Sequence, residues 1–161
     1  MNVGDCMSKL IEFLKGGTDD EGRTLDEILS WDNDSLEYSH DVIQWLFPLT
    51  EPSRCQPHSP FLSEYDAELV KTDPVVIDNI IKSYKRFMQF YAETLEKWVT
   101  PNNHNFLRIT RILKCLEMFD CEECKGCQQI LKSTLDLTYL VNKDIIGETT
   151  KKFWDGAVKE S

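Results

Sequence analysis

Glu37 and His40 form a Glu-x-x-His pair, a spacing that places a carboxylate and an imidazole on the same side of a helix. Di-iron helical bundles use this arrangement, but they need a second such motif and two further carboxylates. The sequence contains no second Glu-x-x-His, so we do not expect a di-metal centre. Two interpretations stay open. His40 either hydrogen-bonds Glu37 at the edge of the core, which we favour, or joins Glu37 and His104 in a metal site.

Four cysteines follow one another at short spacing, in a C-x5-C-x2-C-x2-C run formed by Cys115, Cys121, Cys124 and Cys127. Thiolates at such spacing can hold zinc or an iron–sulfur cluster. The run lacks the two separated cysteine pairs of a zinc finger, and Cys121, Cys124 and Cys127 also follow a helical period. We therefore interpret these residues as small, partly buried thiols, with metal binding as the alternative.

A third group lies on a predicted helix near residues 104–119. His104, Arg108, Arg111 and Cys115 recur at helical spacing and form one stripe, opposite an apolar face. In an acidic chain, a cationic stripe calls for carboxylates, and Glu37, Asp41 and Gln44 form a second polar stripe. We expect an arginine within salt-bridge reach of Glu37 or Asp41. This contact would be either a partly buried ion-pair network or the wall of a polar pocket.

The elements that must position these groups are all helical. A central buried helix is predicted near residues 35–47, with Asp34 as its N-cap and Pro48 as its end, because more than half of its circumference is apolar or aromatic. Capping residues and apolar spacing predict the other helices. These lie near residues 5–15, 24–31, 63–72, 73–98 (one helix, or two with a break near Ala92), 104–119, 122–141 and 149–158. Because period-two alternation and hairpin signals are missing, we predict an all-α fold of six to eight helices.

Length and charge favour a single globular domain and disfavour proteins that bind nucleic acids or anionic membranes. A chain of 161 residues suffices for a sizeable core, and its net charge of −10 disfavours binding to nucleic acids and to anionic membranes. No apolar stretch approaches the ~20 residues that span a bilayer. The first residues do not resemble a secretory signal, so we expect an intracellular protein with reduced cysteines.

Long sequence motifs carry a resemblance to a known family. The stretch WDNDSLEYSHDVIQWLFPL, followed by the proline-rich EPSRCQPHSPFL, resembles the first motif of the opioid growth factor receptor conserved domain. NHNFLRITRIL is similar to the second motif of that family, and GRTLDEIL and FWDGAV also fit. The resemblance implies a soluble domain like that of a receptor for a small opioid peptide, acting on growth and associated with the nuclear envelope and nucleus. The family has no established catalytic chemistry.

We therefore expect one domain over residues 1–161, with a proline-rich surface loop at about 48–62. The expected function is non-enzymatic binding of a small peptide or protein partner, without cofactor and without nucleic acid. The expected location is the cytoplasm or nucleus, and the resemblance alone implies peripheral membrane association. The alternatives are a protein-interaction scaffold and a metal-binding protein or small metal-dependent enzyme, using Glu37, His40 and His104 or the cysteines from Cys115 to Cys127. The expected ligand-binding residues are Glu37, His40, Asp41, Gln44, His104, Asn105, Arg108 and Arg111.

Overall fold

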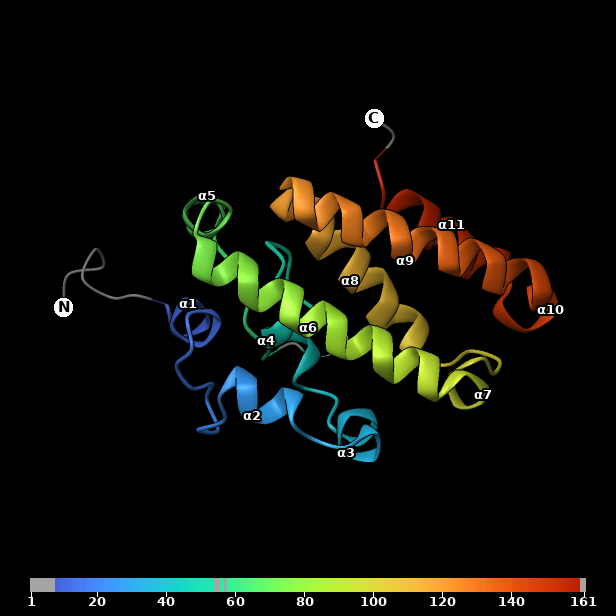
Figure 1. Cartoon of the computed structure of the whole chain (residues 1–161), viewed down its shortest axis with the longest axis horizontal. Helices are drawn as coiled ribbons and strands as arrows, with labels where there is room; N and C mark the ends of the chain where they lie inside the picture. Colours follow the sequence, from blue (N-terminus) through green and yellow to red (C-terminus); the bar gives the residue numbers. More distant parts are fainter. Residues whose placement is uncertain (1–7, 54–55, 57, 160–161) are drawn as a thin grey trace. The chain divides into compact units, whose positions relative to one another are not determined.

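The helices of this chain are seen in a computed structural model that describes residues 8–53, 56 and 58–159. These residues form eleven α-helices, and their only β pairing is an isolated bridge between Thr18 and Thr24 (Figure 1). The predicted all-α class is confirmed. There are more helices than the six to eight expected, because two predicted helices are each broken in two and one short helix was not predicted.

The chain divides into two compact units at the boundary between Ser83 and Tyr84, inside helix α6. The helices of the N-terminal unit are α1 (Lys9–Leu14), α2 (Leu25–Leu29), α3 (Asn33–Tyr38), α4 (Ile43–Leu46), α5 (Glu64–Val70) and the first half of α6 (Pro74–Glu93). Besides α6, four of these helices begin at a side-chain cap. Ser8, Thr24, Asp32 and Ser63 each accept the backbone N–H three residues later, which satisfies one of the open donors of the first turn.

The helix predicted near residues 35–47 is in fact two helices, α3 and α4, so the prediction of one continuous helix is wrong. Asp32, rather than Asp34, caps α3, and the extended backbone of Ser39 ends it. Ser39, His40 and Asp41 are weak helix formers, which explains the break. The expected burial is confirmed for Ile43 and Phe47, and the whole run of residues 42–49 is buried.

The proline-rich segment between α4 and α5 has no helix in its described residues. Its two ends are joined, because Leu62 donates its backbone N–H to the carbonyl of Leu49 over 2.8 Å. Both leucines are buried, whereas Phe61 is exposed. The ends of this segment are therefore anchored in the N-terminal unit.

The C-terminal unit contains the rest of α6 followed by α7 (Leu95–Trp98), α8 (Asn105–Phe119), α9 (Glu122–Val141), α10 (Lys143–Ile146) and α11 (Glu148–Gly156). The long predicted helix breaks at Thr94, two residues beyond the expected Ala92. Helices α8 and α9 form a tight hairpin, and α11 packs on both of them (Figure 1). Trp154 of α11 is fully buried and donates its indole N–H to the carbonyl of Phe106 over 3.2 Å.

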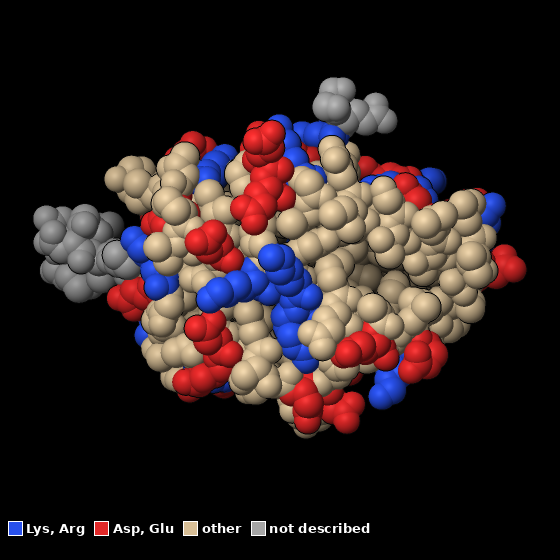
Figure 2. Space-filling model, viewed as in Figure 1, with Lys and Arg blue, Asp and Glu red and all other residues tan. Residues whose placement is uncertain are grey.

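Two charged side chains of α9 bind α11. Lys132 binds Asp155 of α11 over 2.7 Å, and Asp136 binds Lys151 over 3.4 Å. The outward side exposes the apolar side chains of Ile130, Leu137, Leu140 and Val141. Over this helix the surface in Figure 2 is largely uncharged. Among the described residues, no helix is both long enough and apolar enough to cross a membrane.

Asp73 begins α6 and also holds it to Lys15. Its Oδ1 accepts the backbone N–H of Val75 and of Val76, and its Oδ2 lies 3.1 Å from Lys15 Nζ. Burial alone would raise the pKa of Asp73, but the hydrogen bonds from Lys15 and from the backbone, together with the charge of Lys15, lower the pKa below its ordinary value of 3.8. The ionised form of Asp73 therefore stabilises the fold.

We expect Asp73→Asn to lower the free energy of unfolding by about 0.5–1 kcal/mol near neutral pH, because the amide still caps α6 but no longer attracts Lys15. The folded pKa is lowered, so the contribution is fully present above the unfolded value of 3.8 and is lost as pH falls through the folded value. Urea unfolding at a series of pH values should show wild type and variant converging in acid. Asp78→Asn, an exposed change in the same helix, serves as the control, and a constant difference down to pH 2 would contradict the assignment.

Candidate functional site

The site begins in the loop between α1 and α2, which folds around the side chain of Asp19. Asp19 Oδ1 accepts the backbone N–H of Glu21 and of Arg23, each over 2.9 Å, and Asp19 donates its own N–H to the carbonyl of Arg23. Gly22 has φ +79°, a left-handed conformation that glycine adopts without strain, and this lets the turn close. The turn fixes the direction in which Arg23 leaves the backbone.

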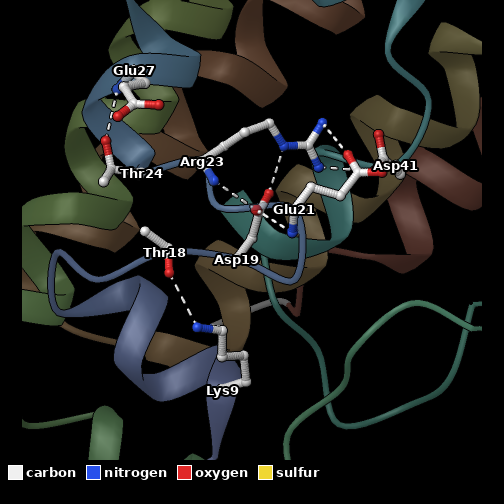
Figure 3. A network of polar contacts seen from close by, with 8 residues as sticks. All are labelled: Lys9, Thr18, Asp19, Glu21, Arg23, Thr24, Glu27 and Asp41. Carbon is white, nitrogen blue, oxygen red and sulfur yellow. Dashed lines mark hydrogen bonds and ion pairs between the residues drawn. The ribbon is translucent and has the colours of Figure 1, made fainter.

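The Arg23 guanidinium faces three carboxylates (Figure 3). Its Nε lies 2.7 Å from Asp19, its Nη1 3.0 Å from Glu21 and its Nη2 2.8 Å from Asp41. Asp19 and Glu21 come from the same loop, whereas Asp41 comes from residues 39–42, the α3–α4 turn. Arg23 therefore ties the α1–α2 loop to the α3–α4 turn with charge-assisted hydrogen bonds. We call these four residues the Arg23 network.

Burial differs among the members of the Arg23 network. The Asp19 side chain is 0% exposed, whereas those of Asp41 and Glu21 are 43% and 61% exposed. Burial alone would lower the pKa of Arg23, but hydrogen bonds to Asp41 and Asp19 raise it above its ordinary value. The guanidinium carbon also lies 5.8 Å from the centre of the Trp31 ring, a cation–π distance.

The network leaves negative charge at the surface. Three carboxylates around one guanidinium carry −3 + 1 = −2. The ring of Tyr38, just before the α3–α4 turn, is 83% exposed, and His40 within the turn is exposed as well. The turn thus combines an accessible aromatic ring with carboxylates that one arginine only partly neutralises. This pattern suits a ligand with a cationic amine and an apolar ring.

The other predicted residues of the N-terminal unit have different surroundings. Glu37 is half-buried. Gln44 is buried in α4, and its Oε1 has no hydrogen-bond partner among the described residues. Trp45 is buried against Phe13, with ring centres 5.4 Å apart, so of the two aromatic residues Tyr38 and Trp45 only Tyr38 is accessible.

The predicted residues of the C-terminal unit lie on α8 or directly before it. Asn105 is buried and satisfied, because it accepts the hydroxyl of Tyr91 over 3.2 Å and donates to Asn103 over 3.0 Å. His104 is exposed beside it. Arg108 and Arg111 are buried, although the helical pattern predicts a polar stripe for them.

The two predicted stripes belong to different units, so the shared site that joins Glu37 and Asp41 to Arg108 and Arg111 stays a prediction. Within its own unit Asp41 already has a cationic partner, Arg23, which the sequence analysis missed. One signal for this partner is present in the sequence. Asp19 and Arg23 are four residues apart with a glycine between them, and Arg23 directly precedes Thr24, the N-cap of α2.

The cysteines of the C-terminal unit gather at the α8–α9 hairpin. Cys115 and Cys124 are buried, Cys121 and Cys127 are half-buried, and all four are free thiols. Burial raises the pKa of both Cys115 and Cys124 well above the ordinary value, so the neutral thiol is the favoured resting form of both. In the described part of the chain, no group of three or more His, Cys, Asp or Glu side chains is arranged to hold a metal ion.

Comparison with known proteins shows the family. The sequence profile of the opioid growth factor receptor (OGFr) conserved region matches residues 17–100, more than half of the chain. This range includes the whole Arg23 network and the α3–α4 turn. The chain belongs to the opioid growth factor receptor family.

Three relatives illustrate the similarity. The chain is 32% identical to Opioid growth factor receptor-like protein 1 of Xenopus tropicalis, over 65% of this chain and 24% of that protein. It is 36% identical to Opioid growth factor receptor of Rattus norvegicus, over 59% of this chain and 20% of that protein. It is 34% identical to Opioid growth factor receptor of Homo sapiens, over 66% of this chain and 18% of that protein. The chain thus spans about a quarter or less of these relatives. No solved structure matches it.

We expect Arg23→Gln to lower the free energy of unfolding by about 2–4 kcal/mol, because it leaves the buried Asp19 carboxylate without its cation. Glu21→Gln removes an exposed partner of the same guanidinium and should cost less than about 1 kcal/mol. Urea unfolding of the two variants beside wild type measures both effects. Equal costs would show that the network does not depend on the buried carboxylate.

Proposed function

We propose that this chain is a non-enzymatic ligand-binding domain and that the α3–α4 turn binds a short opioid-type peptide. The proposal rests on the chain's membership of a family whose relatives carry the name opioid growth factor receptor. The observation that carries it is the exposed Tyr38, three residues before Asp41, a partly neutralised carboxylate of the Arg23 network. We also infer that the domain acts inside the cell, in the cytoplasm or nucleus, as the family resemblance implies.

The chemistry of such a peptide fits the turn in two respects. A free N-terminal amine carries a positive charge, which the network's surplus of negative charge attracts. An aromatic peptide side chain can stack on Tyr38, whose ring loses little conformational freedom on binding. Gln44, Asn105, Arg108 and Arg111 are buried, so we assign them support of the fold rather than direct contact in this proposal. Glu37 at the end of α3, and His40 and Asp41 on the turn, are the remaining proposed contacts.

A second candidate function is a protein-interaction scaffold, and the exposed apolar side chains between residues 130 and 141 of α9 favour it. Ile130, Leu137, Leu140 and Val141 are all more than half exposed in a chain with a net charge of −10. Apolar surface of this kind is typical of contacts between proteins. This surface lies beyond residues 17–100, the part of the chain that the family profile matches. The two candidate functions therefore use different residues and can be tested separately.

We expect a synthetic opioid peptide with an aromatic N-terminal residue to bind the chain, and its N-acetylated form to bind at least about tenfold more weakly, because acetylation removes the amine charge. Tyr38→Ala should weaken binding by about 1–2 kcal/mol, the usual loss for an aromatic contact residue. Isothermal titration calorimetry measures both effects.

Tyr65→Ala is the matched control, since Tyr65 is a 73% exposed tyrosine on α5 of the same unit. This variant should bind the peptide like wild type, and both variants should keep the wild-type melting temperature. The proposal fails if wild type does not bind the free-amine peptide, or if Tyr65→Ala weakens binding as much as Tyr38→Ala.

A further inference from the structure

The α8–α9 corner holds two cysteines in an unusual position. Helix α8 ends at Phe119, Asp120 takes a left-handed conformation with φ 47°, and Cys121 is already the N-cap of α9. Only two residues therefore separate helices of 15 and 20 residues. Lys125 Nζ binds Asp120 over 3.0 Å across the same corner. This tight connection fixes the direction of the Cys121 side chain.

Cys121 caps α9 with its sulfur. Its Sγ accepts the backbone N–H of Cys124 over 3.2 Å. Cys121 is half-buried, so a small molecule can reach it, whereas Cys124 is buried behind it. The two cysteines form a Cys-x-x-Cys pair at the start of a helix, a position where thiols often take part in redox chemistry.

We propose that Cys121 and Cys124 are a redox-active dithiol, which a disulfide of the glutathione class oxidises to an intrachain disulfide across the first turn of α9. The reaction conserves atoms and electrons. The Cys121 thiolate attacks glutathione disulfide, forms a mixed disulfide and expels one glutathione thiolate. Cys124 then loses its proton to water, and its sulfur attacks the Cys121 sulfur and expels the second glutathione thiolate. Two cysteine thiols lose two protons and are oxidised to one disulfide, while one glutathione disulfide is reduced to two glutathione thiolates, which take up two protons from water to give two glutathione molecules.

The local backbone selects Cys121, rather than Cys127, as the partner of Cys124. Both lie three residues from Cys124, but Cys127 is inside α9, where helical geometry fixes its side-chain direction. As N-cap, Cys121 has an extended backbone with φ −85° and ψ 159°, which turns its side chain back over the first turn. Burial and the charge of Glu123 also raise the pKa of Cys127, which reduces its thiolate form.

The chemistry is testable because trypsin separates the competing bonds. In a chain carrying Cys6→Ser and Cys55→Ser, four of the six cysteines remain. We expect incubation with glutathione disulfide, followed by acid quenching and N-ethylmaleimide, to leave two alkylated thiols instead of four. Cleavage after Lys114, Lys125 and Lys132 places Cys115, Cys121 and Cys124 in one peptide and Cys127 in the next. The expected product is a 115–125 peptide that is not linked to peptide 126–132 and carries N-ethylmaleimide on Cys115. Its mass is 2 Da below that of the same peptide with both other thiols reduced, because the disulfide lacks two hydrogens.

Cys121→Ser and Cys127→Ser separate the proposal from a merely structural role. Serine is a good N-cap, so Cys121→Ser should keep α9 intact. After treatment with glutathione disulfide, the Cys121→Ser variant should retain all of its remaining thiols. The Cys127→Ser variant should still lose two thiols, and dithiothreitol should restore these two. Four alkylated thiols in the oxidised parent chain, a linked pair of peptides 115–125 and 126–132, or lasting glutathione on Cys121 would each overturn the proposal. A disulfide that forms as readily in Cys121→Ser would overturn it as well.

Discussion

The Arg23 guanidinium is the contact on which the exposed surface of the N-terminal unit depends. It binds Asp19 inside the α1–α2 loop and Asp41 in the α3–α4 turn, and these two carboxylates lie in segments that share no helix. Without the cation, the buried Asp19 would be a desolvated charge without compensation. With it, the turn has a fixed backbone while Tyr38 and His40 stay exposed. The network thus combines a rigid support with an accessible acidic surface, as a binding site requires.

The helices that the sequence predicts well are those with strong local signals. Thr24, Ser63 and the Asp73-Pro74 pair begin α2, α5 and α6 at the expected positions, because a capping side chain acts on the first turn of its own helix. Helix α9 spans Glu122–Val141, as the spacing of its apolar residues predicts. In contrast, the break at residues 39–42 follows from a competition between an apolar pattern, which favours one helix, and weak helix formers. Apolar periodicity alone does not decide that competition.

The candidate site could be predicted only in part, and for a physical reason. Asp41 was predicted to be a functional residue with a cationic partner, but its partner within the unit is Arg23 in a preceding loop. Loop conformation depends on turns such as the one around Asp19 and Gly22, and helical periodicity carries no information about them. Arg108 and Arg111 show a further limit. Their spacing predicts a polar stripe, but a long arginine side chain can also be buried within a packed helix pair.

Arg23 and Asp41 tie the α3–α4 turn to the α1–α2 loop, and a double-mutant cycle measures how strongly these two side chains depend on each other. Urea unfolding of wild type, Arg23→Gln, Asp41→Asn and the double variant gives the coupling free energy between the two side chains. We predict a coupling of about 1 kcal/mol or more, as residues in one hydrogen-bonded network show. A coupling within about 0.3–0.5 kcal/mol of zero, as independent sites show, would mean that Arg23 and Asp41 do not hold the two segments together.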